Sequence, residues 1–108
     1  MNSADLARSW LIETGTSTVG YVIVSFWFDL EFGGRAAAIT DLYLRREHRR
    51  KGFGRKALEF VEAFCRKEGI SALELQVEKR NAPARAFYKA IGFVPHDRIP
   101  MSKRLRSS

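Results

Sequence analysis

The hydrophobic pattern changes period twice between residues 36 and 77, and this change constrains the fold more than any other feature. The segment AAAITDLYL (36–44) is apolar and is typical of a strand. In FGRKALEFVEAFCRK (53–67) apolar residues recur at helical spacing, whereas ALELQV (72–77) alternates with a period of two. A strand, a helix and a second strand in this order predict a right-handed crossover, which leaves the two strands parallel.

The segments before residue 36 predict two further strands. Residues 10–13 (WLIE) form a short apolar run, and YVIVSFWF (21–28) is dense in β-branched and aromatic residues. The sequences GTSTVG and EFGGR separate these segments, and their glycine content is typical of turns. Because short turns join antiparallel neighbours, we expect three successive antiparallel strands.

A second, shorter helix is predicted after the parallel strand. Asn81 is suited to cap its first turn, and Pro83 is tolerated within that turn. Gly92 provides a stop after ARAFYKAI.

The last segment, residues 93–105, is apolar enough for one or two edge strands, whose pairing Pro95 and Pro100 limit. We therefore expect one α/β domain over residues 1–108. Its mixed central sheet has about five to six strands, mostly antiparallel with one parallel pair, together with two main helices.

Composition excludes several classes of protein. The 19 Lys and Arg residues outnumber the 12 Asp and Glu residues, and the net charge of +7 favours an anionic partner. No apolar run approaches the roughly 18 residues of a membrane span, and the opening MNSADLARSW lacks the apolar core of a signal peptide. With one cysteine, Cys65, and two histidines, we expect neither an internal disulfide nor a metal site. These features favour a cytoplasmic protein without a membrane partner.

The stretch RRKGFG (49–54) gathers three cations and two glycines between a predicted strand and a predicted helix. A helix N-terminus presents unpaired N–H groups, and glycine lets a ligand phosphate approach the backbone closely. The stretch is neither a P-loop nor a dinucleotide-binding fingerprint, because the spacing of its glycines fits neither pattern. An ordinary basic turn is the alternative reading of this stretch alone.

Two motifs occur in a defined order along the chain. The first is Arg-x-x-Gly-x-Gly, at Arg49, Gly52 and Gly54, after a strand that ends DLYL and the residues EHR. The second lies roughly thirty residues further on, at Asn81, Ala84, Phe87, Tyr88, Gly92 and Phe93. Together with the closing MSKRL, these motifs resemble the GNAT superfamily of acetyl-CoA-dependent N-acetyltransferases, over about residues 10–105.

The resemblance implies a GNAT-like fold and a binding site for acetyl-CoA as cosubstrate. The loop backbone from Arg50 to Arg55 would hold the CoA pyrophosphate, and the strand end from Leu42 to Leu44 would pair with the pantetheine arm. Asn81 would bind the pantetheine or fix the second helix. The cofactor-binding residues implied in this way are Leu42, Tyr43, Leu44, Arg49, Arg50, Lys51, Gly52, Phe53, Gly54, Arg55, Asn81, Phe87 and Tyr88.

The resemblance also implies acetyl transfer to a primary amine by direct attack in a ternary complex. Tyr88 would act as the catalytic acid toward the leaving thiolate, since a phenol with a pKa of about 10 can protonate sulfur at neutral pH. A backbone N–H near Leu42 would stabilise the oxyanion. Phe87 and Phe93 are also expected to contribute to the core.

The general base is not identified by the resemblance. Family members with a glutamate on the corresponding strand place it where this chain has Ala38 or Thr40, and neither is acidic. Asp41 is adjacent, but strand alternation predicts that it points to the face opposite Thr40. Glu47 is expected to be solvated or to brace the loop. Further candidates on the acceptor side are Gln76 and Glu78.

The family's first strand and two helices, which help to form the acceptor pocket, have no counterpart in the nine residues before Trp10. We expect a homodimer to cover the resulting open surface, with Trp10, Phe26 or Trp27 at or near the contact.

Two other functions remain open from the sequence. A CoA-binding module without catalysis would fit the missing base and the shortened N-terminus. A basic nucleic-acid-binding protein would fit the net charge and the cations at Arg45, Arg46, Arg49, Arg50 and Lys51. The CoA phosphates already account for these cations, so nucleic acid is the less favoured partner.

Overall fold

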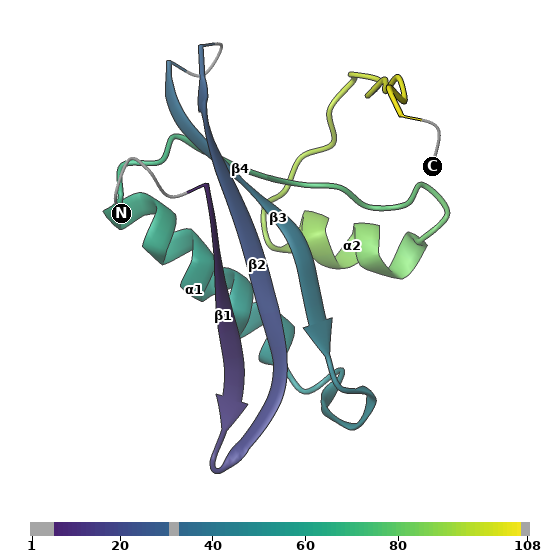
Figure 1. Ribbon diagram of the computed structural model, residues 1–108. Helices are drawn as coiled ribbons and strands as arrows, with labels where there is room; N and C mark the ends of the chain where they lie inside the picture. Colours follow the sequence, from purple (N-terminus) through teal and green to yellow (C-terminus); the bar gives the residue numbers. More distant parts are fainter. Residues whose placement is uncertain (1–5, 31–32, 107–108) are drawn as a thin grey trace.

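The computed structural model describes residues 6–30 and 33–106, which form one four-stranded sheet with two helices (Figure 1). In spatial order the strands are β1 (Ala7–Thr14), β2 (Ser17–Asp29), β3 (Gly34–Leu44) and β4 (Ala72–Leu75). The first three pair antiparallel, and β4 pairs parallel to β3. Between β3 and β4 lie the 3-10 turn η1 (Arg46–His48) and α1 (Phe53–Lys67), and α2 (Ala82–Ala90) follows β4. The predicted antiparallel strands, the parallel pair and both helices are confirmed.

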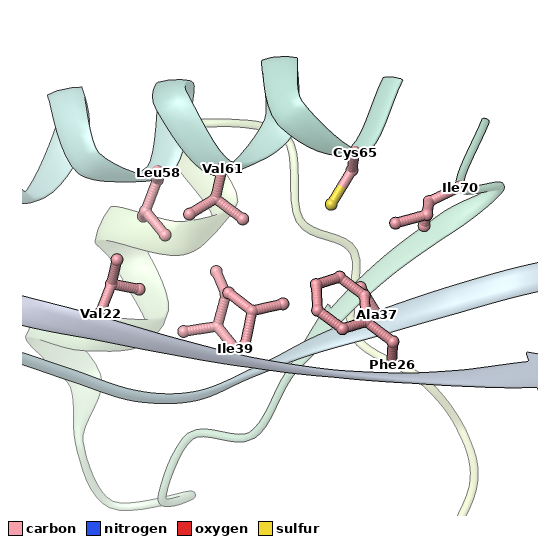
Figure 2. Close-up of a cluster of buried hydrophobic side chains, with 9 residues drawn as sticks. Val22, Phe26, Ala37, Ile39, Leu58, Val61, Cys65 and Ile70 are labelled. Atoms are coloured by element: carbon pink, nitrogen blue, oxygen red, sulfur yellow. The ribbon is translucent and has the colours of Figure 1, made fainter. Parts of the chain in front are cut away.

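One hydrophobic core lies between α1 and the sheet (Figure 2). Alternate residues of β2 point toward α1. The buried residues of α1 are Ala57, Leu58, Val61 and Cys65, whose spacing places them on one side of the helix. The sheet contributes Val22, Val24, Phe26, Ala37 and Ile39, and α1 contributes Leu58, Val61 and Cys65. The apolar side of α1 therefore packs against the apolar side of β2 and β3.

α2 packs on the same side of the sheet as α1, but less deeply. Tyr88 and Ile91, at its C-terminal end, pack against the core cluster, while α2 itself contains no buried residue. In the described part of the chain both helices therefore cover one face of the sheet. Leu11 and Trp27 lie on the opposite face and are 67% and 37% exposed.

β3 contains an irregularity that strand alternation did not predict. Ile23 pairs with Asp41, whereas the next residue of β2, Val24, pairs with Ile39, so Thr40 is an extra residue on β3. Ile39 is buried in the core and Leu42 also packs against it, while both residues between them are exposed. The expectation that Asp41 points away from the face of Thr40 is therefore wrong, because a β-bulge places both residues on the outer face.

The expected five to six strands are reduced to four in the described residues, because residues 93–106 form no strand. Pro95 and Pro100 lack the backbone N–H that a sheet ladder needs. The apolar side chains of this tail are almost fully exposed, at 78–91% for Val94, Ile99, Met101 and Leu105. In Figure 1 the tail leaves α2 and ends away from the sheet.

Two of the three residues expected at a dimer contact lie on the helix side. Trp10 packs edge-on against the rings of Phe60 and Phe64, with ring centroids 5.4 Å and 5.0 Å away. Phe26 is only 6% exposed and belongs to the hydrophobic core, while the homodimer contact itself stays a prediction. Only Trp27 of the three lies on the uncovered face.

Within the described ranges, no helix has the length and apolarity that a membrane crossing requires. Nor do three or more His, Cys, Asp or Glu side chains of these residues gather as a metal site would need.

Candidate functional site

A groove of about 380 Å³ lies where β3 ends and α1 begins, and it extends to the side of α2. Its walls come from three separate parts of the chain, which the crossover brings together. They are the strand end with Leu42, Tyr43 and Leu44, the loop and first turn of α1 with Arg49, Arg50, Gly52, Gly54 and Arg55, and Phe87 of α2. Every residue of this lining belongs to the set that the sequence motifs indicated.

The loop backbone has an unusual conformation at two positions. Arg50 has a φ of 64° and Gly52 a φ of 87°, so both occupy the left-handed region. Left-handed residues in such turns aim successive backbone N–H groups toward one side, and this arrangement forms a concave surface that binds anions. Gly52 adopts its φ at little cost, whereas for an L-residue such as Arg50 the left-handed conformation costs about 1–2 kcal/mol.

The N-terminus of α1 is left without a side-chain cap. Gly52 is the N-cap residue and makes no side-chain hydrogen bond, and the first turn contains no acidic residue. The N–H groups of this turn have no partner within the helix, and they form the positive end of its dipole. The N-terminus of α2 differs, because the side-chain oxygen of Asn81 accepts a hydrogen bond from the Ala84 N–H at 3.2 Å. Of the two helices, α1 is thus the one whose first turn is open to an anion.

Arg49 connects the loop to the strand that precedes it. Its Nε donates a hydrogen bond to the carbonyl oxygen of Leu44 at 3.0 Å, and its guanidinium carbon lies 5.9 Å from the centre of the Tyr43 ring. Just before η1, the N–H of Arg45 donates to the carbonyl of Val19 on β2 at 2.7 Å, which holds the start of the loop against the sheet. The position of the cationic loop is therefore fixed relative to the end of β3.

Gly54 has no side chain, and this leaves space in the groove between β3 and α2. A Cβ at this position would lie 3.6 Å from Cδ1 of Leu44 and 4.0 Å from Cζ of Phe87, which are ordinary contact distances. A side chain here would therefore fit the fold but fill the space between β3 and α2. The two glycines thus have different roles. Gly52 permits the left-handed backbone conformation of the loop, and Gly54 leaves space for a ligand in the groove.

One edge of β3 is open beside the groove. β4 pairs with β3 only from Ala36 to Ile39, and the final partner residue is Leu75. From Thr40 to Leu44, β3 pairs with β2 alone among the described residues. The backbone groups on the far edge of this stretch are available to an extended ligand, in the way that a peptide adds to a sheet edge.

Four of the expected site residues do not line the groove: Lys51, Phe53, Asn81 and Tyr88. The ring of Phe53 packs edge-on against His48 of η1, with centroids 5.8 Å apart. The sequence analysis did not single out His48, whose only signal was its place in the EHR approach to the loop. Asn81 is the cap of α2, which agrees with the second of its two expected roles.

Tyr88 lies among aromatic rings on the helix side of the sheet. Its ring centre is 5.3 Å from that of Phe87 and 5.9 Å from that of Phe93, and both contacts are edge-on. Burial raises the pKa of the Tyr88 phenol above its ordinary value. Tyr88 therefore carries its proton at neutral pH, next to a residue that lines the groove.

The side chains considered for a base lie on the other face or outside the sheet. Asp41 accepts a hydrogen bond from the Tyr21 hydroxyl at 3.1 Å. Glu47 is exposed in η1, and Gln76 and Glu78 are exposed after the end of β4. Tyr21 was missed by the sequence analysis, because its only signal was an outward position on a predicted strand.

Comparison with known proteins agrees with these features. The model of the acetyltransferase (GNAT) family matches residues 2–93. A thialysine N-epsilon-acetyltransferase of Bos taurus is 33% identical over 78 residues, which is 72% of this chain and 45% of that protein. An uncharacterized N-acetyltransferase, YycN, of Bacillus subtilis is 38% identical over 69 residues, 64% of this chain and 44% of that protein. The chain thus spans less than half the length of these curated relatives.

Solved structures resemble this chain over nearly its whole length. An integron cassette protein from the mobile metagenome of Cole Harbour Salt Marsh has a TM-score of 0.83 at 32% identity, over 96% of this chain and 63% of that one. A ribosomal-protein-alanine N-acetyltransferase from Brucella melitensis has a TM-score of 0.79 at 21% identity, over 93% and 72% of the two chains, and supports the fold alone. Since the family model matches most of the sequence, the chain belongs to the acetyltransferase (GNAT) family.

Proposed function

We propose that this chain is an acyltransferase that moves the acetyl group of acetyl-CoA to a primary amine, by direct attack in a ternary complex. One observation carries the proposal: a single groove joins the uncapped N-terminus of α1 to the open edge of β3. The first feature suits a pyrophosphate and the second suits an extended amide-containing arm. Acetyl-CoA contains both parts in one molecule.

The proposed cofactor-binding residues form two groups, one for the pyrophosphate of acetyl-CoA and one for its pantetheine arm. The backbone of Arg50, Gly52 and Gly54 faces the pyrophosphate, and the loop cations, with Lys51 and Arg55, balance its charge. The strand end from Leu42 to Leu44 pairs with the pantetheine arm. Phe87 packs against that arm from the side of α2.

The transfer needs a proton for the leaving sulfur. Tyr88 is the residue we assign to this step, because its pKa is raised by burial and it adjoins Phe87 at the groove. A backbone N–H at the bulged end of β3, near Leu42, is the donor we assign to the oxyanion. In the step itself the amine nitrogen bonds to the carbonyl carbon, the carbon–sulfur bond breaks with its electron pair going to sulfur, and the sulfur takes the Tyr88 proton. The nitrogen gives up one proton to solvent, and solvent restores the proton of Tyr88.

The partner of the uncovered sheet face belongs to the same proposal. Trp27 and Leu11 expose apolar surface there, and we propose that two copies of the chain cover it in a homodimer. A dimer of this kind would also place part of one copy near the acceptor side of the other.

A thermal-shift and turnover experiment tests the function. CoA and acetyl-CoA should raise the melting temperature, and pantetheine, which lacks the pyrophosphate, should raise it far less. Ligand at 100 times its Kd stabilises the native state by about 2.7 kcal/mol. Release of CoA should then depend on added primary amine. Stabilisation without turnover would instead indicate a CoA-binding module, and salt-dependent retention on DNA without stabilisation would indicate a nucleic-acid-binding protein.

A further inference from the structure

The strands of the sheet carry their cations on the helix side only. Arg8 and Arg35 are the Lys and Arg residues of β1, β2, β3 and β4. The guanidinium carbon of Arg8 lies 5.2 Å from the centre of the Phe64 ring on α1, and Arg35 donates to the carbonyl oxygen of Glu68 at 3.2 Å. The strands therefore present no cation on the outer face, in a chain that carries 19 Lys and Arg residues.

Each strand instead contributes one carboxylate to the outer face. Asp29 accepts a hydrogen bond from the Trp27 indole at 3.3 Å, and Asp41 accepts one from Tyr21. Strand alternation places Glu13 on the same side as Leu11. Glu74 points away from its neighbours Leu73 and Leu75, which pack against the core. The four outer carboxylates belong to Glu13, Asp29, Asp41 and Glu74.

The C-terminal tail, residues 94–106, has the opposite charge. It contains one acidic residue, Asp97, against the cations of Arg98, Lys103, Arg104 and Arg106. All of its residues are exposed, and its larger apolar side chains are 78–91% exposed. A basic segment that exposes apolar side chains is complementary to an acidic face that also exposes them.

Three apolar side chains follow β2 across the outer face. Leu11 of β1 pairs with Tyr21 and is 67% exposed. Ile23 follows Tyr21 by two residues, and Trp27, which is 37% exposed, follows it by six. At about 3.3 Å per residue, this row of apolar side chains is roughly 20 Å long.

The tail has apolar side chains at the same intervals. Met101 follows Ile99 by two residues and Leu105 follows it by six. Even intervals place side chains on one side of an extended segment. An extended tail parallel to β2 therefore sets Ile99, Met101 and Leu105 over the three apolar side chains of the sheet.

The position of Lys103 favours the parallel direction. In that register Lys103 lies over Ser25, whose row across the sheet continues through Ala38 to Glu74. A tail that runs the other way would set the ammonium of Lys103 over Ile23. Opposite charge and apolar spacing thus select the same arrangement.

We propose that the C-terminal tail of a second copy lies along β2 on the outer face, and that two copies cover each other in this way. This inference rests on the homodimer proposed above and names the segment that covers the face. The tail begins at Phe93, which packs against the core on the helix side, and it ends away from its own sheet (Figure 1). A two-fold pair supplies one tail to each outer face.

Thiol cross-linking tests which chain the tail covers. Equal amounts of Ser25→Cys and Lys103→Cys, treated with a short bismaleimide, should give a covalent dimer that contains one copy of each variant. Val94→Cys in place of Lys103→Cys is the matched control and should give far less. The parent chain, whose cysteine Cys65 is buried, is the blank. A chain with both substitutions that links within a monomer would overturn the role of the second copy.

A charge exchange tests the register. Lys103→Glu and Glu74→Lys should each raise the Kd of the dimer about 5- to 20-fold, measured by sedimentation, and the two together should recover most of the loss. Lys67→Glu makes the same charge change at an exposed position on the helix side and should leave the Kd unchanged.

The outcomes separate this inference from the proposed function. A dimer whose Kd is the same in Lys103→Glu as in the parent chain would overturn the role of the tail and leave the homodimer intact. A parent chain that is monomeric at micromolar concentration would overturn both. The CoA-induced thermal shift and amine turnover of the parent chain decide acetyl transfer separately.

Discussion

The Nε of Arg49 donates a hydrogen bond to the carbonyl oxygen of Leu44 at 3.0 Å, and this contact joins the cationic loop to the strand it follows. Both residues line the groove, so the contact sets the distance between the surface proposed for the pyrophosphate and the edge proposed for the pantetheine. A rigid spacing between two subsites lowers the entropic cost of binding a ligand that occupies both.

Replacing Arg49 should therefore weaken CoA binding through the geometry of the loop as well as through charge. Arg49→Lys keeps the charge but lacks the Nε that donates to Leu44 and the planar group over Tyr43. We expect both Arg49→Lys and Arg49→Ala to raise the Kd for CoA about 5- to 50-fold, measured by calorimetry, with the lysine variant closer to alanine than to the parent. Recovery of parent affinity in Arg49→Lys would show that charge alone matters.

The two loop glycines should respond differently to substitution. Gly52→Ala forces a residue with a Cβ to a φ of 87°, which should cost about 1 kcal/mol of stability and weaken the CoA-induced thermal shift. Gly15→Ala is the matched control, because Gly15 has a φ of 55° and open space around it in the turn between β1 and β2. It should lose similar stability and keep the full CoA shift.

Gly54→Ala should leave stability nearly unchanged, since its Cβ meets only ordinary contacts, yet reduce the CoA shift by filling part of the groove. Thermal melts with and without CoA measure both quantities. An undiminished shift would place the ligand elsewhere.

Tyr88→Phe keeps the ring and removes the proton donor. If Tyr88 protonates the leaving sulfur, kcat should fall by roughly 10- to 1000-fold while the CoA shift stays the same. In the parent chain, kcat should not decline through loss of the Tyr88 proton until the pH exceeds 10, because burial raises the pKa of this phenol. Tyr43→Phe serves as the control for removing a phenol at the groove, and unchanged kcat in Tyr88→Phe would reduce Tyr88 to a packing role.

Substitutions of Asn81 can distinguish its role as the cap of α2 from a role in binding CoA. Asn81→Ala should cost about 1 kcal/mol through loss of the helix cap, and Asn81→Asp should restore most of it because a carboxylate also accepts from the Ala84 N–H. If Asn81 only caps α2, the CoA shift of Asn81→Asp should equal that of the parent. A stable Asn81→Asp variant with a much reduced shift would assign the amide to the ligand.

The proposed homodimer depends on the outer face of the sheet. Trp27→Glu places a charge on the most accessible of the three expected contact residues and should convert a dimer into a monomer without loss of fold. Light scattering at micromolar concentration distinguishes a monomer of 12.3 kDa from a dimer. A parent chain that is already monomeric would remove this part of the proposal.

The sequence predicted the elements whose apolar pattern is continuous. The bounds expected for α1 match those observed, because its buried residues recur regularly and glycine residues lie at both ends. β1 extends three residues before the expected start at residue 10, and β4 ends two residues before the expected Val77, since strand ends depend on pairing rather than on composition.

The bulge and the tail could not be predicted in the same way. The extra residue at Thr40 appears only in the pairing of β3 with β2, which leaves no mark on the sequence of β3 itself. The tail from residue 93 has apolar residues that suit a strand, but it pairs with no strand in the described part of the chain.

The site was predictable where a motif specified the backbone, and less so where side chains meet across strands. Gly52 and Gly54 both line the groove. The motif predicts this, because its first glycine permits the turn and its second leaves space for a ligand. The contact between Tyr21 and Asp41 joins residues twenty positions apart, and it depends on the same bulge. No local pattern contains that information.

Because α2 packs only shallowly on the sheet, we expect its local stability to differ between the free chain and the chain with a bound ligand. An element without a buried residue opens at a low free energy, so the backbone amides of α2 should exchange with deuterium faster than those of α1. A ligand that contacts Phe87 would hold α2 against the rest of the groove and slow that exchange. Deuterium uptake in α2 would then report occupancy of the groove without any need to know the acceptor.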